Sequence, residues 1–296
     1  MKLLAVFAVV MAVGLSAQPM SRTATMKMFD AWKAPVPPRH LIGNLYYVGA
    51  IGVSSYLIAT PDGHVILDSG FEETVPIIAR GVKELGFDLK DVKLILSSHA
   101  HIDHTGGHAA LKRLTGAEVV ASEADARVLE SGGAEDFIPM PKDLVTYEPV
   151  KVDRVVRDGE VVEIGGVKLT ANVTPGHTRG ATTWTMEVEE GGESYRVVFF
   201  SSASINPGTR LTGPDAAYPE IAHDLERSFA RFREMKCDIF LAPHGGQFAM
   251  AEKFARLEKG ERAAEVLVDP EGWGKTIAAQ EKAFREALAA ERGAGE

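Results

Sequence analysis

The sequence has few of the features that mark several large classes of protein. It contains one cysteine, Cys237, so an intrachain disulfide is impossible. No proline-, glycine- or serine-rich linker and no low-complexity run divides its 296 residues. The formal net charge is −9, and no basic stretch suits a phosphate backbone. We therefore expect one cooperative folding unit that does not bind nucleic acid.

The N-terminus carries the pattern of a secretory signal peptide. Lys2 is followed by an apolar run over residues 3–15 and then by the small residues Ser16 and Ala17. The run is too short to span a membrane, and no cysteine follows it to carry a lipid anchor. We expect residues 1–17 to be a signal peptide, residues 18–296 to form a single domain, and the protein to be secreted, to the periplasm of a two-membrane source. The alternative is a buried N-terminal helix.

Side chains that bind metals are concentrated in residues 99–104, which read His-Ala-His-Ile-Asp-His. Imidazole nitrogens and carboxylate oxygens are the ligands of a catalytic Zn²⁺ that keeps one position open for water. Residues 92–96 predict a short buried strand, and Thr105-Gly106-Gly107 predicts a turn that opens a helix. The segment therefore lies in the loop after a strand, where α/β proteins usually build their sites.

Two isolated histidines follow other strand-like runs. His177 comes after residues 167–173, and His244 comes after residues 239–241. Each stands beside proline and glycine, which mark tight loops. Either histidine alone is more easily explained as structural, but beside the 99–104 cluster both become candidate ligands. Six candidates are too many for one tetrahedral zinc and suit two.

The hydrophobic pattern predicts strands, then helices, then strands, then helices, which is typical of two stacked sheets flanked by helices. Predicted strands cover residues 45–48, 55–59, 64–67, 92–96, 118–121, 161–164, 167–173, 182–188, 195–200 and a run that ends at Leu241. Predicted helices cover residues 73–85, 109–114, 124–129, 223–235 and 276–290. Residues 131–149 lack periodicity and predict a long loop, a common place for function. The pattern by itself does not identify the fold.

Residues 98–107, Ser-His-Ala-His-Ile-Asp-His-Thr-Gly-Gly, resemble the signature of the metallo-β-lactamase superfamily. The resemblance runs from about Trp32 to the C-terminus and includes residues 218–222, 227–230 and 237–238. These segments look most like the third subclass of class B metallo-β-lactamases. The resemblance implies an α/β fold, a four-layer αββα sandwich with two mixed sheets flanked by helices and the metal site at the sheet edge. It also implies a monomer.

The resemblance assigns a role to each candidate ligand. The first zinc belongs to His99, His101 and His177. The second zinc belongs to Asp103, His104 and His244. A hydroxide between the two metals would be the nucleophile, oriented by Asp103, so that no covalent intermediate is needed.

Further roles follow from the same resemblance. Asp68 matches an acidic position near the metals and would orient a ligand histidine from behind; the alternative is an ordinary turn aspartate. Ser202 and Ser204 stand where relatives such as thioesterases and lactonases place a bridging aspartate. We expect these serines to hold the water and a substrate carboxylate, unless they simply end a strand. Trp32 and Phe137 are candidate walls of the substrate pocket.

The remaining polar and aromatic candidates receive structural roles. Some relatives pair a cysteine at position 237 with a later one, and Trp273 stands at the matching place. We therefore expect Cys237 to be buried and an aromatic side chain to replace the cross-link. We expect surface or cap positions for four further histidines, with His108 on the next helix and pointing away from the site: His40, His64, His108 and His223.

Three functions are compatible with these residues. The first is an exported zinc β-lactamase that opens penicillins, cephalosporins and carbapenems; a serine β-lactamase is excluded because the chain has no Ser-x-x-Lys. The second is another zinc hydrolase of the same fold, a lactonase, thioesterase or esterase, because fold does not determine substrate. The third is a non-enzymatic zinc-binding domain, which the complete ligand set disfavours.

Overall fold

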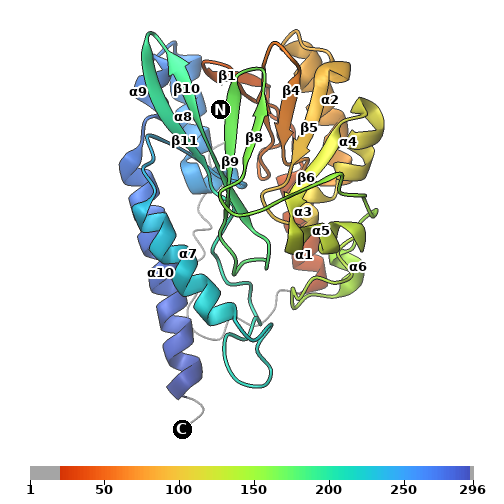
Figure 1. Cartoon of the computed structure of the whole chain (residues 1–296), viewed down its shortest axis with the longest axis vertical. Helices are drawn as coiled ribbons and strands as arrows, with labels where there is room; N and C mark the ends of the chain where they lie inside the picture. Colours follow the sequence, from red (N-terminus) through yellow and green to blue (C-terminus); the bar gives the residue numbers. More distant parts are fainter. Residues whose placement is uncertain (1–20, 294–296) are drawn as a thin grey trace.

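The computed structural model describes residues 21–293, so the expected signal peptide lies outside the described residues. The chain forms a seven-stranded and a five-stranded sheet. Figure 1 shows helices on the outer face of each sheet, which gives four layers. This arrangement confirms the predicted α/β fold of two mixed sheets flanked by helices.

The seven-stranded sheet has its strands in sequence order. The first four strands pair antiparallel, and β4 to β7 pair parallel. The strands are β1 (Arg39–Ile42), β2 (Leu45–Tyr47), β3 (Tyr56–Ile58), β4 (His64–Leu67), β5 (Val92–Leu96), β6 (Glu118–Ser122) and β7 (Arg154–Val156). The parallel strands direct the carboxyl ends of β4, β5 and β6 to one edge of this sheet.

The five-stranded sheet has the order β12-β11-β10-β9-β8. Its strands pair antiparallel except for β11 and β12, which are parallel. They are β8 (Val161–Ile164), β9 (Val167–Val173), β10 (Thr182–Glu190), β11 (Glu193–Phe199) and β12 (Ile239–Leu241). The ends of β9, β11 and β12 each lead into a loop that carries a candidate site residue.

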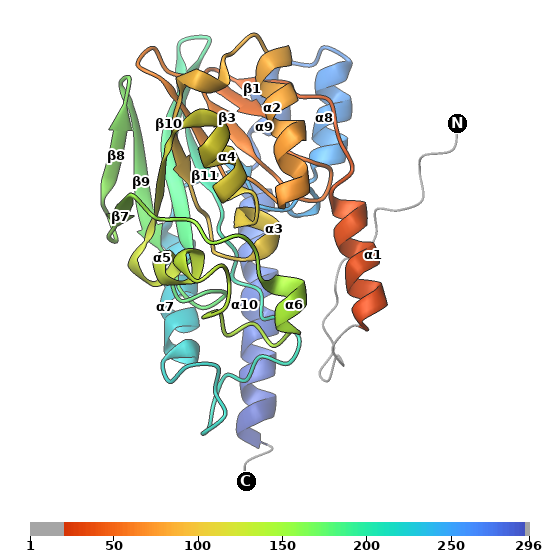
Figure 2. The same cartoon turned by 90° about the vertical axis from the view of Figure 1, so that its right-hand side faces the viewer.

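Amphipathic helices cover both sheets, because each buries one apolar stripe and exposes its polar face. Figure 1 shows α2 and α4 outside the seven-stranded sheet and α7 and α10 outside the five-stranded sheet, while α1 stands at one side in Figure 2. The helices are α1 (Arg22–Trp32), α2 (Val75–Glu84), α3 (Ile102–Thr105), α4 (His108–Thr115), α5 (Glu123–Glu130), α6 (Lys142–Val145), α7 (Ile221–Glu234), α8 (Met250–Glu258), α9 (Ala263–Leu267) and α10 (Pro270–Gly293). Among the residues described, none of these helices is both long and apolar enough to cross a membrane.

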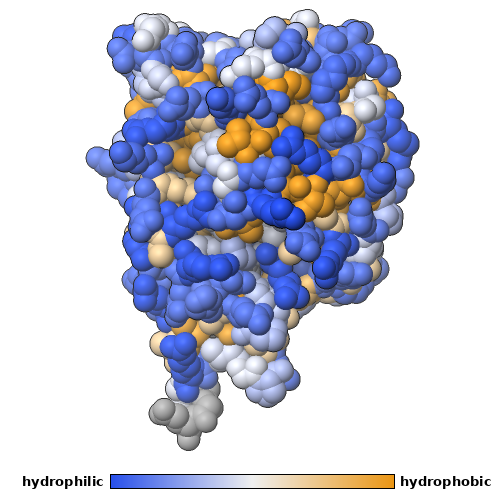
Figure 3. All heavy atoms as spheres, viewed as in Figure 1, coloured by the Kyte–Doolittle hydropathy of each residue, from blue (hydrophilic) through white to orange (hydrophobic). Residues whose placement is uncertain are grey.

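The main hydrophobic core contains side chains from both sheets and from α7 and α10. Trp273 packs here against Phe200, Phe232 and Phe240, with ring centroids 5.4 to 5.8 Å apart. Cys237 is also buried, as expected, and its thiol is free. A second core lies between the seven-stranded sheet and the helices on its outer face. The face seen in Figure 3 is mainly hydrophilic, with hydrophobic patches over the region of β6 and β8.

Most predicted strands and helices are confirmed, and the differences have physical reasons. Helix α1 was not predicted because it buries little, with Thr25 its one buried residue. Strands β1 and β7 are short strands at the sheet edges. The C-terminal helix begins at Pro270 rather than residue 276, because proline is favoured in the first turn and Asp269 accepts a hydrogen bond from the amide of Gly272. Part of the predicted loop 131–149 is the single turn α6.

Candidate metal centre

The candidate ligands come from loops at the carboxyl ends of strands in both sheets. His99 and His101 follow β5, and Asp103 and His104 lie on the short helix α3. His177 lies between β9 and β10, and His244 follows β12. We call His99, His101 and His177 the first trio, and Asp103, His104 and His244 the second trio.

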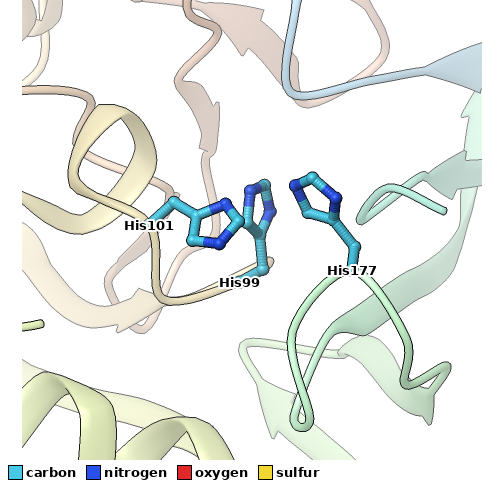
Figure 4. Close-up of side chains that lie close together, drawn as sticks. All are labelled: His99, His101 and His177. Carbon is cyan, nitrogen blue, oxygen red and sulfur yellow. The ribbon is translucent and has the colours of Figure 1, made fainter. Parts of the chain in front are cut away.

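The structure brings all six side chains together in these two trios. In each trio, one ligand atom per residue lies within 4.8 Å of the others. Figure 4 shows the three rings of the first trio facing one another, two from the loop after β5 and one from the opposite loop. The rings of His99 and His104 have centroids 4.3 Å apart, so the two trios are adjacent.

The second trio converges on one point. Nε2 of His104 lies 3.3 Å from Nε2 of His244 and 3.1 Å from Oδ2 of Asp103. Nε2 of His244 lies 3.6 Å from the same carboxylate oxygen. Three donor atoms this close suit a shared divalent cation, which would accept an electron pair from each.

Hydrogen bonds to the backbone determine which nitrogens remain free. His177 donates from Nδ1 to the carbonyl of Ser204 at 2.7 Å, which leaves Nε2 for a metal. His244 donates from Nδ1 to the carbonyl of Gly52 at 2.9 Å, which again leaves Nε2. In the described part of the chain, Nε2 of His99 is buried without a hydrogen-bond partner. A buried polar atom costs free energy unless it is satisfied, and a bound cation would satisfy this one.

The surroundings hold four of the six candidate ligands in the protonation states that a metal needs. Burial lowers the pKa of His99 well below its usual value, that of His177 to about 3, and that of His244 to about 4. Burial acts to raise the pKa of Asp103, but the neighbouring His104 and His244 outweigh it and hold that pKa far below its usual value. Neutral imidazoles and an ionised carboxylate are the forms that coordinate metals.

Asp68 lies behind the second trio, at the end of β4. Its carboxylate accepts hydrogen bonds from the amide and hydroxyl of Ser98, and Oδ2 lies 3.9 Å from Nδ1 of His104. Burial raises the pKa of Asp68 to about 6. Its φ angle of 60° is a left-handed conformation that a non-glycine residue adopts at a cost. The side chain is thus placed where it can orient His104.

Asp136 is a buried carboxylate that the sequence analysis missed. It lies in the predicted loop 131–149, and its Oδ2 is 3.3 Å from Nε2 of His101. Burial lowers the pKa of His101, but Asp136 outweighs this effect and the net pKa is raised. A carboxylate at Nε2 leaves Nδ1 of this imidazole for a metal. An aspartate next to Phe137 in a long loop was the one available signal.

The serine segment after β11 contacts the first trio. The hydroxyls of Ser202 and Ser204 lie 3.2 Å apart, and Ser204 provides the carbonyl that orients His177. Ser202 is buried with a φ angle of 144°, a backbone strain of the kind found at functional sites. Ser204 is exposed. The segment therefore lies against the first trio, through the contact of Ser204 with His177.

The two predicted wall residues flank opposite parts of the site. The ring of half-buried Trp32 lies 4.8 Å from that of His244. Phe137 follows Asp136, and its ring centroid lies 5.3 Å from that of Tyr218. The guanidinium carbon of Arg179 lies over the Tyr218 ring, 4.9 Å from its centroid. Both walls are thus adjacent to residues that touch a trio.

The expectation for the remaining histidines was wrong in two cases. His40 and His223 are exposed, as predicted, but His64 is buried. His108 lies on α4, yet it is fully buried beneath the motif, where its two ring nitrogens contact the hydroxyls of Ser69 and Ser97 at 2.7 and 2.8 Å. The single turn of α3 redirects the chain, so that the first residue of α4 faces inward.

Comparison with known proteins gives the class of this protein. Residues 48–244 match the profile of the metallo-beta-lactamase superfamily, so the chain belongs to that superfamily. It is similar to the FEZ-1 metallo-beta-lactamase from Legionella gormanii, at 40% identity and a TM-score of 0.84 over 88% of this chain and 98% of that one. It is also similar to BJP-1, a subclass B3 metallo-beta-lactamase of Bradyrhizobium japonicum, at 37% identity and a TM-score of 0.81 over 90% and 98% of the two chains. The predicted likeness to the third subclass is confirmed.

Curated relatives match a shorter part of the chain. A hydroxyacylglutathione hydrolase of Rhodopseudomonas palustris (strain BisB18) is 37% identical over 123 residues, which is 42% of this chain and 39% of the relative. The chain therefore spans well under two thirds of the length of this relative. These similarities establish a metallo-hydrolase fold with candidate metal ligands.

Proposed function

We propose that this protein is a zinc-dependent β-lactamase that hydrolyses the lactam amide of penicillins, cephalosporins and carbapenems without a covalent intermediate. In this proposal residues 1–17 direct secretion to the periplasm, and residues 18–296 act as a single-domain monomer. Two zinc ions bind, one to each trio. The observation that carries the proposal is the pair of adjacent trios with serines, instead of a carboxylate, beside them.

The buried carboxylates around the trios favour bound divalent cations. Four carboxylates lie at or behind the trios, and each is at least nine-tenths buried: Asp68, Asp103, Asp125 and Asp136. Buried charges are tolerated when they are paired or bind metals. The three candidate ligand histidines that burial makes neutral do not offset these carboxylates, and Zn²⁺ bound to the trios would add positive charge beside them.

The residues of the chain divide the chemical tasks. Zn²⁺ bound to the trios would supply a hydroxide nucleophile near neutral pH, since it would lower the pKa of water to about 7. Asp103 is ionised and lies between His104 and His244, where it can accept a hydrogen bond from the attacking water and orient it. Ser202 and Ser204 can donate hydrogen bonds to the carboxylate of a lactam, and Trp32 and Phe137 limit access to the site.

A thioesterase of the hydroxyacylglutathione hydrolase type is the second candidate, because curated relatives with that name match the chain around the motif. Residues 199–204 read Phe-Phe-Ser-Ser-Ala-Ser and offer no carboxylate to bridge two metals. The likeness to lactamases covers about nine-tenths of this chain, whereas the matches to the two thioesterases cover 42% and 52% of it. Both differences favour the lactam substrate.

The test is hydrolysis by the purified mature protein of a carbapenem, a penicillin, a cephalosporin and a hydroxyacylglutathione thioester, side by side. Each is assayed before and after a chelator and again with zinc added back. We expect lactam turnover that the chelator abolishes and zinc restores. His177→Ala should lose activity and one zinc, whereas the control His223→Ala, an exposed position, should keep both. Zinc-restored thioester turnover without lactam turnover would overturn the proposal.

A further inference from the structure

A buried carboxylate outside the two trios joins the loops that carry the first trio. Asp125 lies in the first turn of α5 and is 1% exposed. Its Oδ2 accepts hydrogen bonds from the amide of Ala100 at 2.9 Å and from the hydroxyl of Thr178 at 3.0 Å. Its Oδ1 accepts a hydrogen bond from the amide of Gly180 at 2.9 Å. In the described part of the chain, the carboxylate therefore accepts hydrogen bonds from three groups, none of which is a candidate ligand.

The positions of these donors are specific to the first trio. Ala100 lies between His99 and His101, and Thr178 directly follows His177. The carboxylate thus holds the loop of Ala100, from one sheet, and the loop of Thr178, from the other, against the same helix, α5. Among the residues described, no member of either trio hydrogen-bonds to Asp125, and none of the three donors is next in sequence to a member of the second trio.

The loop that carries His177 and Gly180 approaches α5 closely. A Cβ atom at Gly180 would lie 2.4 Å from the amide nitrogen of Asp125 and 2.6 Å from its Oδ1, so the contact requires glycine. The hydroxyl of Ser122, just before α5, donates to the carbonyl of Gly180 at 2.6 Å. A contact that excludes one methyl group holds the loop to a narrow range of positions.

We infer that Asp125 is a positioning residue that holds His99 and His101 at the correct distance from His177, and so determines the affinity of the first metal site alone. The inference rests on the proposed function in that it takes the first trio to bind zinc. Asparagine at this position would turn an amide N–H₂ group toward at least one of the three donors. One loop would then move away from the other, and the first trio would open.

The experiment separates the two sites by using two single-site backgrounds. In His244→Ala the first trio is complete, and in His177→Ala the second trio is complete. Asp125→Asn is added to each, and zinc affinity is measured by competition with a chromophoric chelator, with bound zinc counted by native mass spectrometry. We expect affinity to fall roughly 10- to 100-fold in the His244→Ala background and to stay unchanged in the His177→Ala background.

A matched control uses a carboxylate that also accepts a backbone hydrogen bond. Asp153 accepts from the amide of Val119 at 2.9 Å and pairs with Lys112, away from both trios. Asp153→Asn should leave zinc affinity unchanged in both backgrounds. Asp125→Asn could lower zinc affinity equally in the two backgrounds, or in neither. Either result would overturn the inference, whereas two zinc ions bound to the wild type would still support the two metal sites. A wild type that binds no zinc would overturn the proposed function and this inference with it.

A milder pair of variants covers the case in which Asp125→Asn does not fold. Thr178→Val removes one donor to Asp125 with little change of shape, whereas Thr178→Ser keeps the hydroxyl. We expect Thr178→Val to weaken zinc binding in the His244→Ala background only, and Thr178→Ser to restore it. Loss of zinc affinity in both variants would show that zinc binding depends on the packing of the Thr178 methyl group and not on the hydrogen bond to Asp125. That result would overturn the role of Asp125.

Discussion

Oδ2 of Asp136 lies 3.3 Å from Nε2 of His101, and both side chains are buried. Asp136 also precedes Phe137, which packs on Tyr218. One loop therefore carries both a neighbour of a candidate ligand and a candidate wall residue. A change at this carboxylate should affect zinc binding directly.

We predict that Asp136→Asn weakens zinc binding to the first trio about tenfold or more, the usual effect of losing the carboxylate beside a ligand histidine. The carboxylate raises the pKa of His101 and favours a proton on Nε2, which leaves Nδ1 for the metal. Chelator competition measures the affinity. Asp143→Asn, an exposed residue paired with Arg22 near the same loop, is the control. Equal affinities for Asp136→Asn and wild type would contradict the assignment.

The serine segment should act on substrate and not on zinc. Ser204 orients His177 through its backbone carbonyl, which Ser204→Ala retains. We predict that Ser202→Ala and Ser204→Ala bind two zinc ions and raise KM for a carbapenem about 2- to 10-fold, the range expected for one lost hydrogen bond. Steady-state kinetics measure KM, and metal analysis measures the zinc content of each variant. Loss of zinc from either variant would point to a metal-binding role instead.

His108 should make the metal-free protein less stable in acid. Burial lowers its pKa to about 3 in the folded protein from 6.5 in the unfolded chain. Between these values only the unfolded chain binds the proton. The free energy of unfolding therefore falls as pH drops from 6.5 toward 3, by up to about 1.4 kcal/mol per pH unit for this group. At pH 7 the group makes no such contribution.

The variant His108→Gln isolates this contribution. Urea unfolding of the chelator-treated proteins at pH 7, 6 and 5 should show a smaller loss of stability per pH unit in the variant than in the wild type. The buried ligand histidines and Asp68 contribute to both proteins and cancel in the difference. A native circular dichroism spectrum at pH 7 confirms that the variant folds. Identical slopes in the two proteins would contradict a buried neutral His108.

Trp273 should contribute to stability without affecting the metals. Its ring packs against Phe200, Phe232 and Phe240 in the main core. We predict that Trp273→Ala lowers the free energy of unfolding by about 3 to 5 kcal/mol, as large aromatic truncations do. Trp273→Phe keeps an aromatic ring and should lose less. Zinc content should stay at the wild-type value in any folded fraction, and a selective loss of one zinc would contradict a purely structural role.

Local sequence predicts most of the secondary structure because periodicity and turn residues act within a few positions. Strands β4, β5 and β9 to β11 follow their predicted positions closely. The pattern fails for α1, which buries little, and for the start of α10, where two glycines obscure a helix that Asp269 caps. In these places the hydrophobic periodicity is weak, because α1 buries one residue and a local cap, not a periodic apolar face, starts α10.

The sequence by itself determined the kind of site: the residue types of the 99–104 segment, the two isolated histidines after strands, and the absence of a carboxylate beside the serines. Only the tertiary structure places Asp125 and Asp136 beside the first trio. Asp125 meets Ala100 from the neighbouring strand end and Thr178 from the opposite sheet, and Asp136 meets His101 on the side of the seven-stranded sheet. Such contacts join residues that are far apart in the chain, so no local pattern marks them, and only the convergence of strand ends brings them within hydrogen-bonding distance.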